Sequence, residues 1–174
     1  PCSLLCAVVV LAGALAGHTA EGAEHKRVLV LYSTRPDAQI SIVGETELTR
    51  TLAGGLDGEL DYYSEFIDRS VFPEDAYRDP FRDFLRAKYR SVRFDLVIVL
   101  QELALDFIQH DRELFGDTPV VFLSTIDTHP SLPNATGLIH VRNFAATLTL
   151  IRQLQPEVNQ IFVVSGAAAI DAQM

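Results

Sequence analysis

The chain has 174 residues and a formal net charge of −9 at pH 7, because 23 aspartates and glutamates outnumber 14 lysines and arginines. This acidic balance argues against a nucleic-acid-binding protein and against docking on an anionic membrane face, since both need basic surface. Both cysteines, Cys2 and Cys6, lie near the N-terminus. The rest of the chain therefore offers no disulfide, no thiol nucleophile and no cysteine-based metal site.

Residues 4–17 form an apolar run, LLCAVVVLAGALAG. It is shorter than the roughly 20 residues that span a bilayer. Small and polar residues follow it, and this order predicts a secretory signal peptide over residues 1–23, with cleavage near Ala20 or Ala23. The basic segment that opens such signals is missing, and we interpret the sequence as beginning inside the signal. An uncleaved membrane anchor and a buried helix are the alternatives.

Apolar runs alternate with amphipathic stretches along the remaining chain. Residues 28–33 (VLVLYS) are apolar and predict a strand buried on both faces, as in parallel sheets. Residues 40–53 predict a helix that two glycines end. Residues 60–64 predict a second, shorter strand. About 150 residues follow the leader, which suits one ordinary domain.

The next helix has an ambiguous start. Apolar residues at helical spacing predict a helix that includes residues 81–88. Asp79 and Pro80 suit an N-cap and a first helical residue, but a start near Glu74 is also compatible. Residues 95–100 (DLVIVL) then predict the third strand, which is the clearest in the chain.

The C-terminal half continues the same alternation. Residues 102–115 predict an amphipathic helix, and residues 119–124 predict the fourth strand. Residues 137–141 suit a fifth strand after a long loop. A helix over 144–154 and a strand over 161–165 complete the predicted elements.

This alternation with short connections predicts the α/β class, with a doubly wound parallel sheet and right-handed crossovers. In such sheets ligands bind beyond the carboxyl ends of the strands. We therefore expect a binding site built from polar residues that follow the strands. The candidate ligand-binding residues at the strand ends are Ser33, Thr34, Arg35, Glu65, Gln101, Glu102, Ser124, Thr125 and Asp127, and Arg142 is a further candidate.

Structural roles are alternatives for the same residues. Ser33 and Thr34 suit caps of the following helix, and Arg35 suits a solvated loop charge. Glu65 and Glu102 suit surface acids, or acids at a helix N-terminus where the dipole favours them. The argument for a site is the clustering of these residues at one edge of one sheet.

Motifs of known catalytic and cofactor sites are missing. The chain lacks the glycine-rich loops of dinucleotide and P-loop sites and the GxSxG elbow of α/β-hydrolases. Its histidines do not pair at zinc-binding spacing. A phosphoacceptor receiver needs acidic residues after the first strand and an aspartate ending the third, where this chain has Ser33 and Gln101. We predict no catalytic residue, no metal, no cofactor and no enzymatic activity of this chain.

Several blocks of core and turn residues resemble a known family. The blocks are KRVLVLYSTRPD, DYYSEFIDRSVFP, DFLRAKY, FDLVIVLQELALDFI, LFGDTPVVFLS, NATGL and LQPEVNQIFVVSGAA. Together they resemble the ABC-transporter substrate-binding-protein-like domain, which has a type I periplasmic-binding-protein fold. The nearest resemblance is to the N-terminal sensor region of bacterial sensor histidine kinases.

This resemblance implies two α/β lobes that close on a ligand. Residues 26–141 would form the first lobe, and residues 142–174 would form the hinge and the beginning of the second lobe. The implied function is an extracytoplasmic solute-binding sensor domain with a transmembrane signalling partner, periplasmic and membrane-tethered in the full-length protein. A free periplasmic substrate-binding protein that serves an ABC permease is the alternative. A secreted α/β enzyme is an alternative from another class.

The charges among the candidate residues bear on the ligand. Arg35 and Arg142 would favour a carboxylate or another anion. Glu65, Glu102 and Asp127 would favour an amine or an amide. Both sets together suggest a small amino-acid-like or anionic ligand.

Overall fold

The computed structural model describes residues 25–68, 75–125, 131–140 and 143–164. Its strands form one sheet in which every neighbouring pair is parallel. The strand order is β2-β1-β3-β4-β5. The strands are β1 (His25–Tyr32), β2 (Glu59–Phe66), β3 (Leu96–Leu100), β4 (Val120–Ser124) and β5 (Ala135–Ile139).

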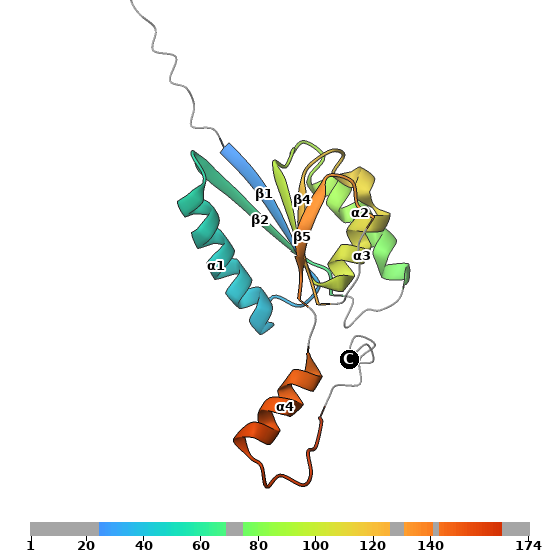
Figure 1. Ribbon diagram of the computed structural model, residues 1–174. Helices are drawn as coiled ribbons and strands as arrows, with labels where there is room; N and C mark the ends of the chain where they lie inside the picture. The colour runs from blue at the N-terminus through green and yellow to red at the C-terminus, as the bar shows by residue number, and fades with distance from the viewer. Residues whose placement is uncertain (1–24, 69–74, 126–130, 141–142, 165–174) are drawn as a thin grey trace, which may run out of the picture.

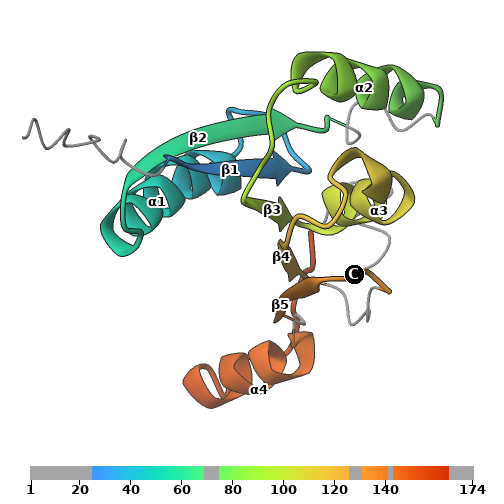
Figure 2. The same ribbon diagram turned by 90° about the horizontal axis from the view of Figure 1, so that it is seen from above.

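Helices cover both faces of this sheet. Helix α1 (Gln39–Gly55) lies on one face, and α2 (Asp75–Lys88) and α3 (Glu102–His110) lie on the other (Figures 1 and 2). A short 3-10 helix, η1 (Arg112–Leu114), follows α3, and α4 (Phe144–Leu154) follows β5. This arrangement confirms the predicted doubly wound α/β class.

The central strands are apolar because both of their faces are covered. The last five residues of β1 are all buried. Val28 of β1 pairs with Tyr62 of β2 on one side and with Leu96 of β3 on the other. The fifth strand begins and ends two residues earlier than predicted. Its Gly137 lies opposite Phe122 of β4, where a Cβ would approach the Phe122 carbonyl oxygen to 2.3 Å.

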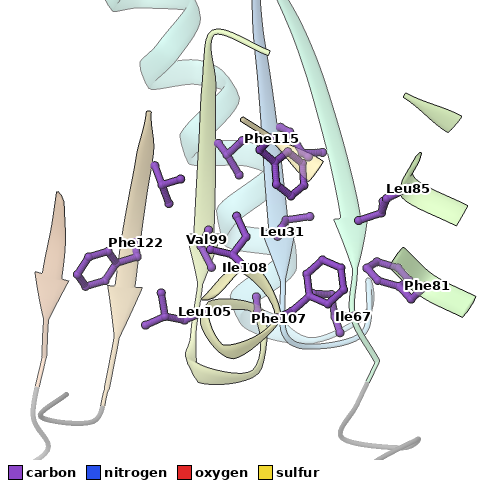
Figure 3. Packing of buried hydrophobic residues seen from close by; sticks show 14 of the residues in the cluster. Leu31, Ile67, Phe81, Leu85, Val99, Leu105, Phe107, Ile108, Phe115 and Phe122 are labelled. Atoms are coloured by element: carbon purple, nitrogen blue, oxygen red, sulfur yellow. The ribbon is translucent and has the colours of Figure 1, made fainter. Parts of the chain in front are cut away.

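The larger hydrophobic core lies between the sheet and helices α2 and α3 (Figure 3). Leu31 and Val99 contribute to it from the central strands, and Phe107 and Ile108 contribute from α3. The Phe107 ring meets the Phe81 ring of α2 nearly edge-on, with their centroids 5.3 Å apart. This contact fixes α3 against α2, and so fixes the segment that leaves β3.

The smaller core lies between the sheet and α1 and includes Tyr32, which is fully buried. The Tyr32 hydroxyl lies 3.2 Å from that of Tyr62, which donates to Glu45 Oε1 of α1 at 3.2 Å. Burial raises the pKa of both phenols, that of Tyr62 to about 12. Helix α1 packs so closely because residue 44 is glycine: a Cβ at Gly44 would lie 2.7 Å from the Tyr32 hydroxyl oxygen.

Helix α2 begins before Asp79, so the start near Glu74 is the better of the two predictions. Pro80 is the sixth residue of the helix. A proline at this position has no N–H to donate to the carbonyl of Ala76. Both Pro80 and Ala76 are exposed, so water can satisfy that carbonyl.

The helix predicted over 102–115 is two elements, because α3 ends at His110. Asp111 leaves the helical conformation, with φ of −114° and ψ of 34°. Its buried carboxylate accepts a hydrogen bond from Arg78 Nε of α2 at 2.9 Å, and Arg82 Nη1 lies 3.8 Å away. The helix therefore ends at the residue whose carboxylate pairs with the arginines of α2.

Helix α4 matches the predicted range and lies beyond the carboxyl ends of the strands (Figure 1). Its N-cap residue Asn143 accepts a hydrogen bond from the Ala146 N–H at 2.8 Å. The strand predicted over 161–165 is wrong for residues 161–164, which have no regular structure and are exposed. A strand needs a neighbour for its backbone hydrogen bonds, and none of the described strands pairs with residues 161–164.

None of the helices in the described ranges is long and apolar enough to cross a membrane. The predicted boundary between two lobes near residue 141 stays a prediction.

Candidate functional site

The candidate site lies at the carboxyl edge of the sheet, where the strand order reverses between β1 and β3. The chain leaves β1 toward α1 on one face and leaves β3 toward α3 on the other (Figure 1). Ligands of doubly wound sheets bind outside this edge. Seven predicted residues end or follow β1, β3 and the neighbouring strand β4 at this edge: Ser33, Thr34, Arg35, Gln101, Glu102, Ser124 and Thr125.

Ser33 joins β1 to β3 and to α3. Its hydroxyl donates to the Leu100 carbonyl oxygen at 2.8 Å and accepts a hydrogen bond from the Ala104 N–H at 2.9 Å. The side chain is buried, so both contacts lie in a poorly solvated environment. Ser33 therefore positions the edge, and it satisfies an N–H in the first turn of α3 instead of capping α1. The N-cap of α1 is Ala38, which makes no side-chain cap.

Gln101 has a strained backbone at the end of β3. Its φ of 72° and ψ of 174° lie in a region that residues other than glycine avoid. Such strain costs about 1–3 kcal/mol and concentrates at functional sites. Its N–H donates to the Leu123 carbonyl at 2.8 Å, and its carbonyl accepts from the Leu105 N–H at 3.1 Å. The side-chain amide is half-buried and makes no hydrogen bond to any residue that the structure describes.

Glu102 joins the start of α3 to the end of β4. Its Oε1 accepts hydrogen bonds from the N–H of Thr125, from the Thr125 hydroxyl at 2.7 Å and from the Ser124 hydroxyl at 3.4 Å. Burial disfavours its charged form, but these hydrogen bonds outweigh burial and hold the pKa of Glu102 below its usual range. The group is therefore an ionised carboxylate at neutral pH, and its Oε1 is occupied by the protein itself.

Glu102→Gln should lower the free energy of unfolding near neutral pH by about 1 kcal/mol. A fully buried hydrogen bond to a charged group contributes somewhat more, but Glu102 is partly exposed and solvent weakens the interaction. The folded-state pKa of Glu102 is depressed. The stabilisation is therefore present above the unfolded-state pKa and disappears as pH falls through the folded-state pKa.

Urea unfolding at several pH values between about 7 and about 3 checks this result. The difference between wild type and variant should shrink toward zero as the pH falls. Glu47→Gln, at an exposed position of α1, is the matched control and should show no such trend. A pH-independent difference at position 102 would contradict the assigned role of the charge.

Glu65 has internal partners, and the surface-acid alternative is wrong for it because the residue is 7% exposed. Its Oε1 accepts hydrogen bonds from Lys88 Nζ at 2.5 Å and from the Tyr89 hydroxyl. Burial, followed by the hydrogen bond to Glu65, raises the pKa of the Tyr89 phenol. Glu65 thus holds the end of α2 against β2, on the face that α2 covers.

The other predicted residues divide into two groups. The Thr34 hydroxyl lies 2.9 Å from that of Ser41, in the first turn of α1. Arg35 is 56% exposed and pairs with Asp37 at 2.9 Å, so it stands at the surface of the loop after β1. Asp127 and Arg142 lie outside the described residues.

Sequence reasoning missed the strain at Gln101, because no glycine marks the position. It also missed the internal satisfaction of Glu65 and Glu102, because their partners are far away in the sequence. Within the ranges that the structure describes, no group of three or more histidine, cysteine, aspartate or glutamate side chains is arranged to hold a metal ion.

No family model matches the chain, and no curated protein matches it. The class that the fold and its edge define is an α/β domain with a five-stranded parallel sheet. This class is compatible with a Rossmann-like domain or with a lobe of a periplasmic binding protein.

Proposed function

We propose that this chain is the solute-binding part of the extracytoplasmic sensor domain of a bacterial histidine kinase. The family resemblance supports the proposal, as do the apolar leader typical of exported proteins and a sheet compatible with a periplasmic-binding-protein lobe. The main supporting observation is Gln101 at the edge where such sheets bind ligands: its backbone is strained, and its amide makes no hydrogen bond within the described ranges.

The groups at this edge favour a small ligand with an anionic end. The side chains of Glu102 and Ser33 already make hydrogen bonds within the protein, so we expect them to shape the site without binding the ligand directly. Arg35 pairs with the exposed Asp37, and because exposed ion pairs contribute little free energy, a ligand carboxylate can replace Asp37 at small cost. The Gln101 amide supplies both a donor and an acceptor. A small carboxylate, of the amino-acid type, matches an arginine and an amide better than an apolar or cationic solute does.

Ligand binding would act by a population shift. A ligand held between two lobes favours the closed form only by its difference in affinity for the closed and open forms. In a sensor, closure would move a transmembrane segment and change the activity of the kinase. The same closure in a free substrate-binding protein would signal a permease, which is the alternative function.

A thermal-shift panel of amino acids and small dicarboxylates, with the complete gene product, tests ligand binding. A ligand at about 100 times its Kd stabilises the folded state by about 2.7 kcal/mol. Gln101→Ala and Arg35→Ala should each weaken the binding of a stabilising compound by about tenfold in calorimetry, since each removes one strong hydrogen-bonding partner. Arg50→Ala, at an exposed position of α1, should bind as wild type.

Unchanged affinity in both the Gln101 and the Arg35 variants would contradict the site, and no stabilisation by any compound in the panel would contradict the ligand class. The gene past the codon for Met174 separates the two functions. A membrane-spanning segment followed by a histidine-kinase core would support the sensor. A stop after a second lobe, beside permease genes, would support the carrier.

A further inference from the structure

A concave region lies at the opposite edge of the sheet from the candidate site. It has a volume of about 670 Å³, within the range of about 300–1,000 Å³ that is usual for small-molecule sites. Its walls are the end of α2, the loop over residues 89–95 that leads into β3, and the turn over residues 115–118 that leads into β4. Both loops precede strands, so the region belongs to the amino edge of the sheet.

Three arginines line this region: Arg86, Arg90 and Arg93. Arg86 pairs with Asp83 at 3.2 Å and with Glu113 at 3.8 Å. Arg90 and Arg93 are exposed, and neither makes an ion pair or hydrogen bond with any residue in the described ranges. One hollow is thus lined by two guanidinium groups that have no partner among the described residues, in a chain with a net charge of −9.

The lining of the hollow contains fewer acidic residues than arginines. Glu113 and Asp117 are its acidic residues, so three arginines and two carboxylates leave one net positive charge in the lining. Arg112 does not line the hollow, but it donates to the carbonyl of the lining residue Thr118 and keeps two buried guanidinium nitrogens without hydrogen-bond partners in the described part of the chain. The C-terminal end of α2 adds only about half a negative charge. The balance therefore favours one anionic group, not a polyanion.

The floor of the hollow is apolar and aromatic. The rings of Tyr89 and Phe94 pack edge to face with centroids 5.0 Å apart, and Phe94 approaches Phe115 at 6.5 Å. Val92 and Leu114, both half-buried, complete this surface. Aromatic edges and faces bind flat apolar bodies, and guanidinium groups bind carboxylates with two parallel hydrogen bonds.

We propose that this hollow is a second ligand site, which binds a small aromatic monocarboxylate. The apolar body contacts Tyr89 and Phe94, and the carboxylate is bound by Arg90 and Arg93. The site is distinct from the carboxyl edge proposed for the solute, and it does not depend on the sensor function.

Naphthoate is the probe, and its fluorescence anisotropy is measured during titration with the complete gene product. Arg90→Gln combined with Arg93→Gln should raise the Kd for naphthoate by at least about tenfold, because both anion-binding groups are lost. Both arginines are exposed and unpaired in the described structure, so the double variant should keep the wild-type circular dichroism and urea midpoint. Arg50→Gln, which changes an exposed arginine on α1, is the matched control and should leave the Kd unchanged.

Two further measurements test the proposal independently of the arginine variants. Asp117→Asn removes a carboxylate from the rim and should tighten naphthoate binding several-fold, while keeping the backbone carbonyl that accepts from Asn134 Nδ2. Neutral naphthamide should bind at least about tenfold more weakly than naphthoate. The proposal is overturned if naphthoate does not bind, if the double variant binds it as wild type does, or if naphthamide binds equally well. The solute site at the carboxyl edge is tested separately, by the Gln101 and Arg35 variants.

Discussion

Asp111→Ala should lower the free energy of unfolding by about 3 kcal/mol, which is the low end of the range for breaking a buried ion pair. The Asp111 carboxylate is 4% exposed and lies 2.9 Å from Arg78 Nε, whose side chain is 21% exposed. Removing the carboxylate leaves a guanidinium with little access to water. The result is at the low end because Arg78 keeps some contact with solvent.

Chemical denaturation with urea measures this change. Asp83→Ala is the matched control, since Asp83 also contacts Arg82 but is 61% exposed, and this variant should be indistinguishable from wild type. An equal effect at both positions would contradict the buried pairing between α2 and the residue that ends α3.

Phe107→Ala should lower the free energy of unfolding by about 4 kcal/mol, because it combines a lost apolar transfer with a cavity. The ring is fully buried between the sheet and α2 and packs edge-on against Phe81 (Figure 3). Phe84→Ala removes a ring of the same size from the outer side of α2, where it is 47% exposed, and should cost no more than about 1 kcal/mol.

Thermal and urea unfolding of the two variants compare the sites directly. A similar loss for Phe84→Ala and Phe107→Ala would mean that α3 is not packed under α2 as described. Since Phe107 lies on the helix that begins at Glu102, its variant should also weaken the geometry of the carboxyl edge. Ligand binding should therefore be tested in a less disruptive variant, such as Gln101→Ala.

The fold was accessible from sequence wherever a local pattern matches a tertiary requirement. Residues 28–33 are apolar at nearly every position, and a strand buried on both faces demands this. The two glycines that end α1 and the range of α4 were equally clear. The class of the fold followed from the alternation alone, because parallel strands need crossover connections.

Predictions failed where long-range contacts override local pattern. The apolar periodicity after Glu102 continues past His110, but the buried pairing of Asp111 with Arg78 divides the helix. Residues 161–164 have strand-like composition, yet no described strand lies beside them to supply hydrogen bonds. Local sequence carries neither kind of information.

The candidate site shows the same division. The rule for parallel sheets located the edge, and Ser33, Gln101 and Glu102 lie there. Their roles could not be predicted, because their hydrogen-bond partners lie 22 to 71 residues away in the sequence. Ser33 binds Leu100 and Ala104, and Glu102 binds Ser124 and Thr125. The strain at Gln101 is visible only in the backbone angles.

The contact between Gly44 and Tyr32 has a consequence for how this protein can vary. With a tyrosine at position 32, the helix above it has no room for any side chain at position 44, since even a methyl carbon would meet the phenol oxygen at 2.7 Å. A phenylalanine there would still place its ring carbon Cε1 2.8 Å from that methyl carbon, so only a smaller, aliphatic residue at position 32 removes the conflict. The two positions are therefore expected to change together over evolution, with glycine at 44 wherever tyrosine occupies 32, although 11 residues separate them along the chain.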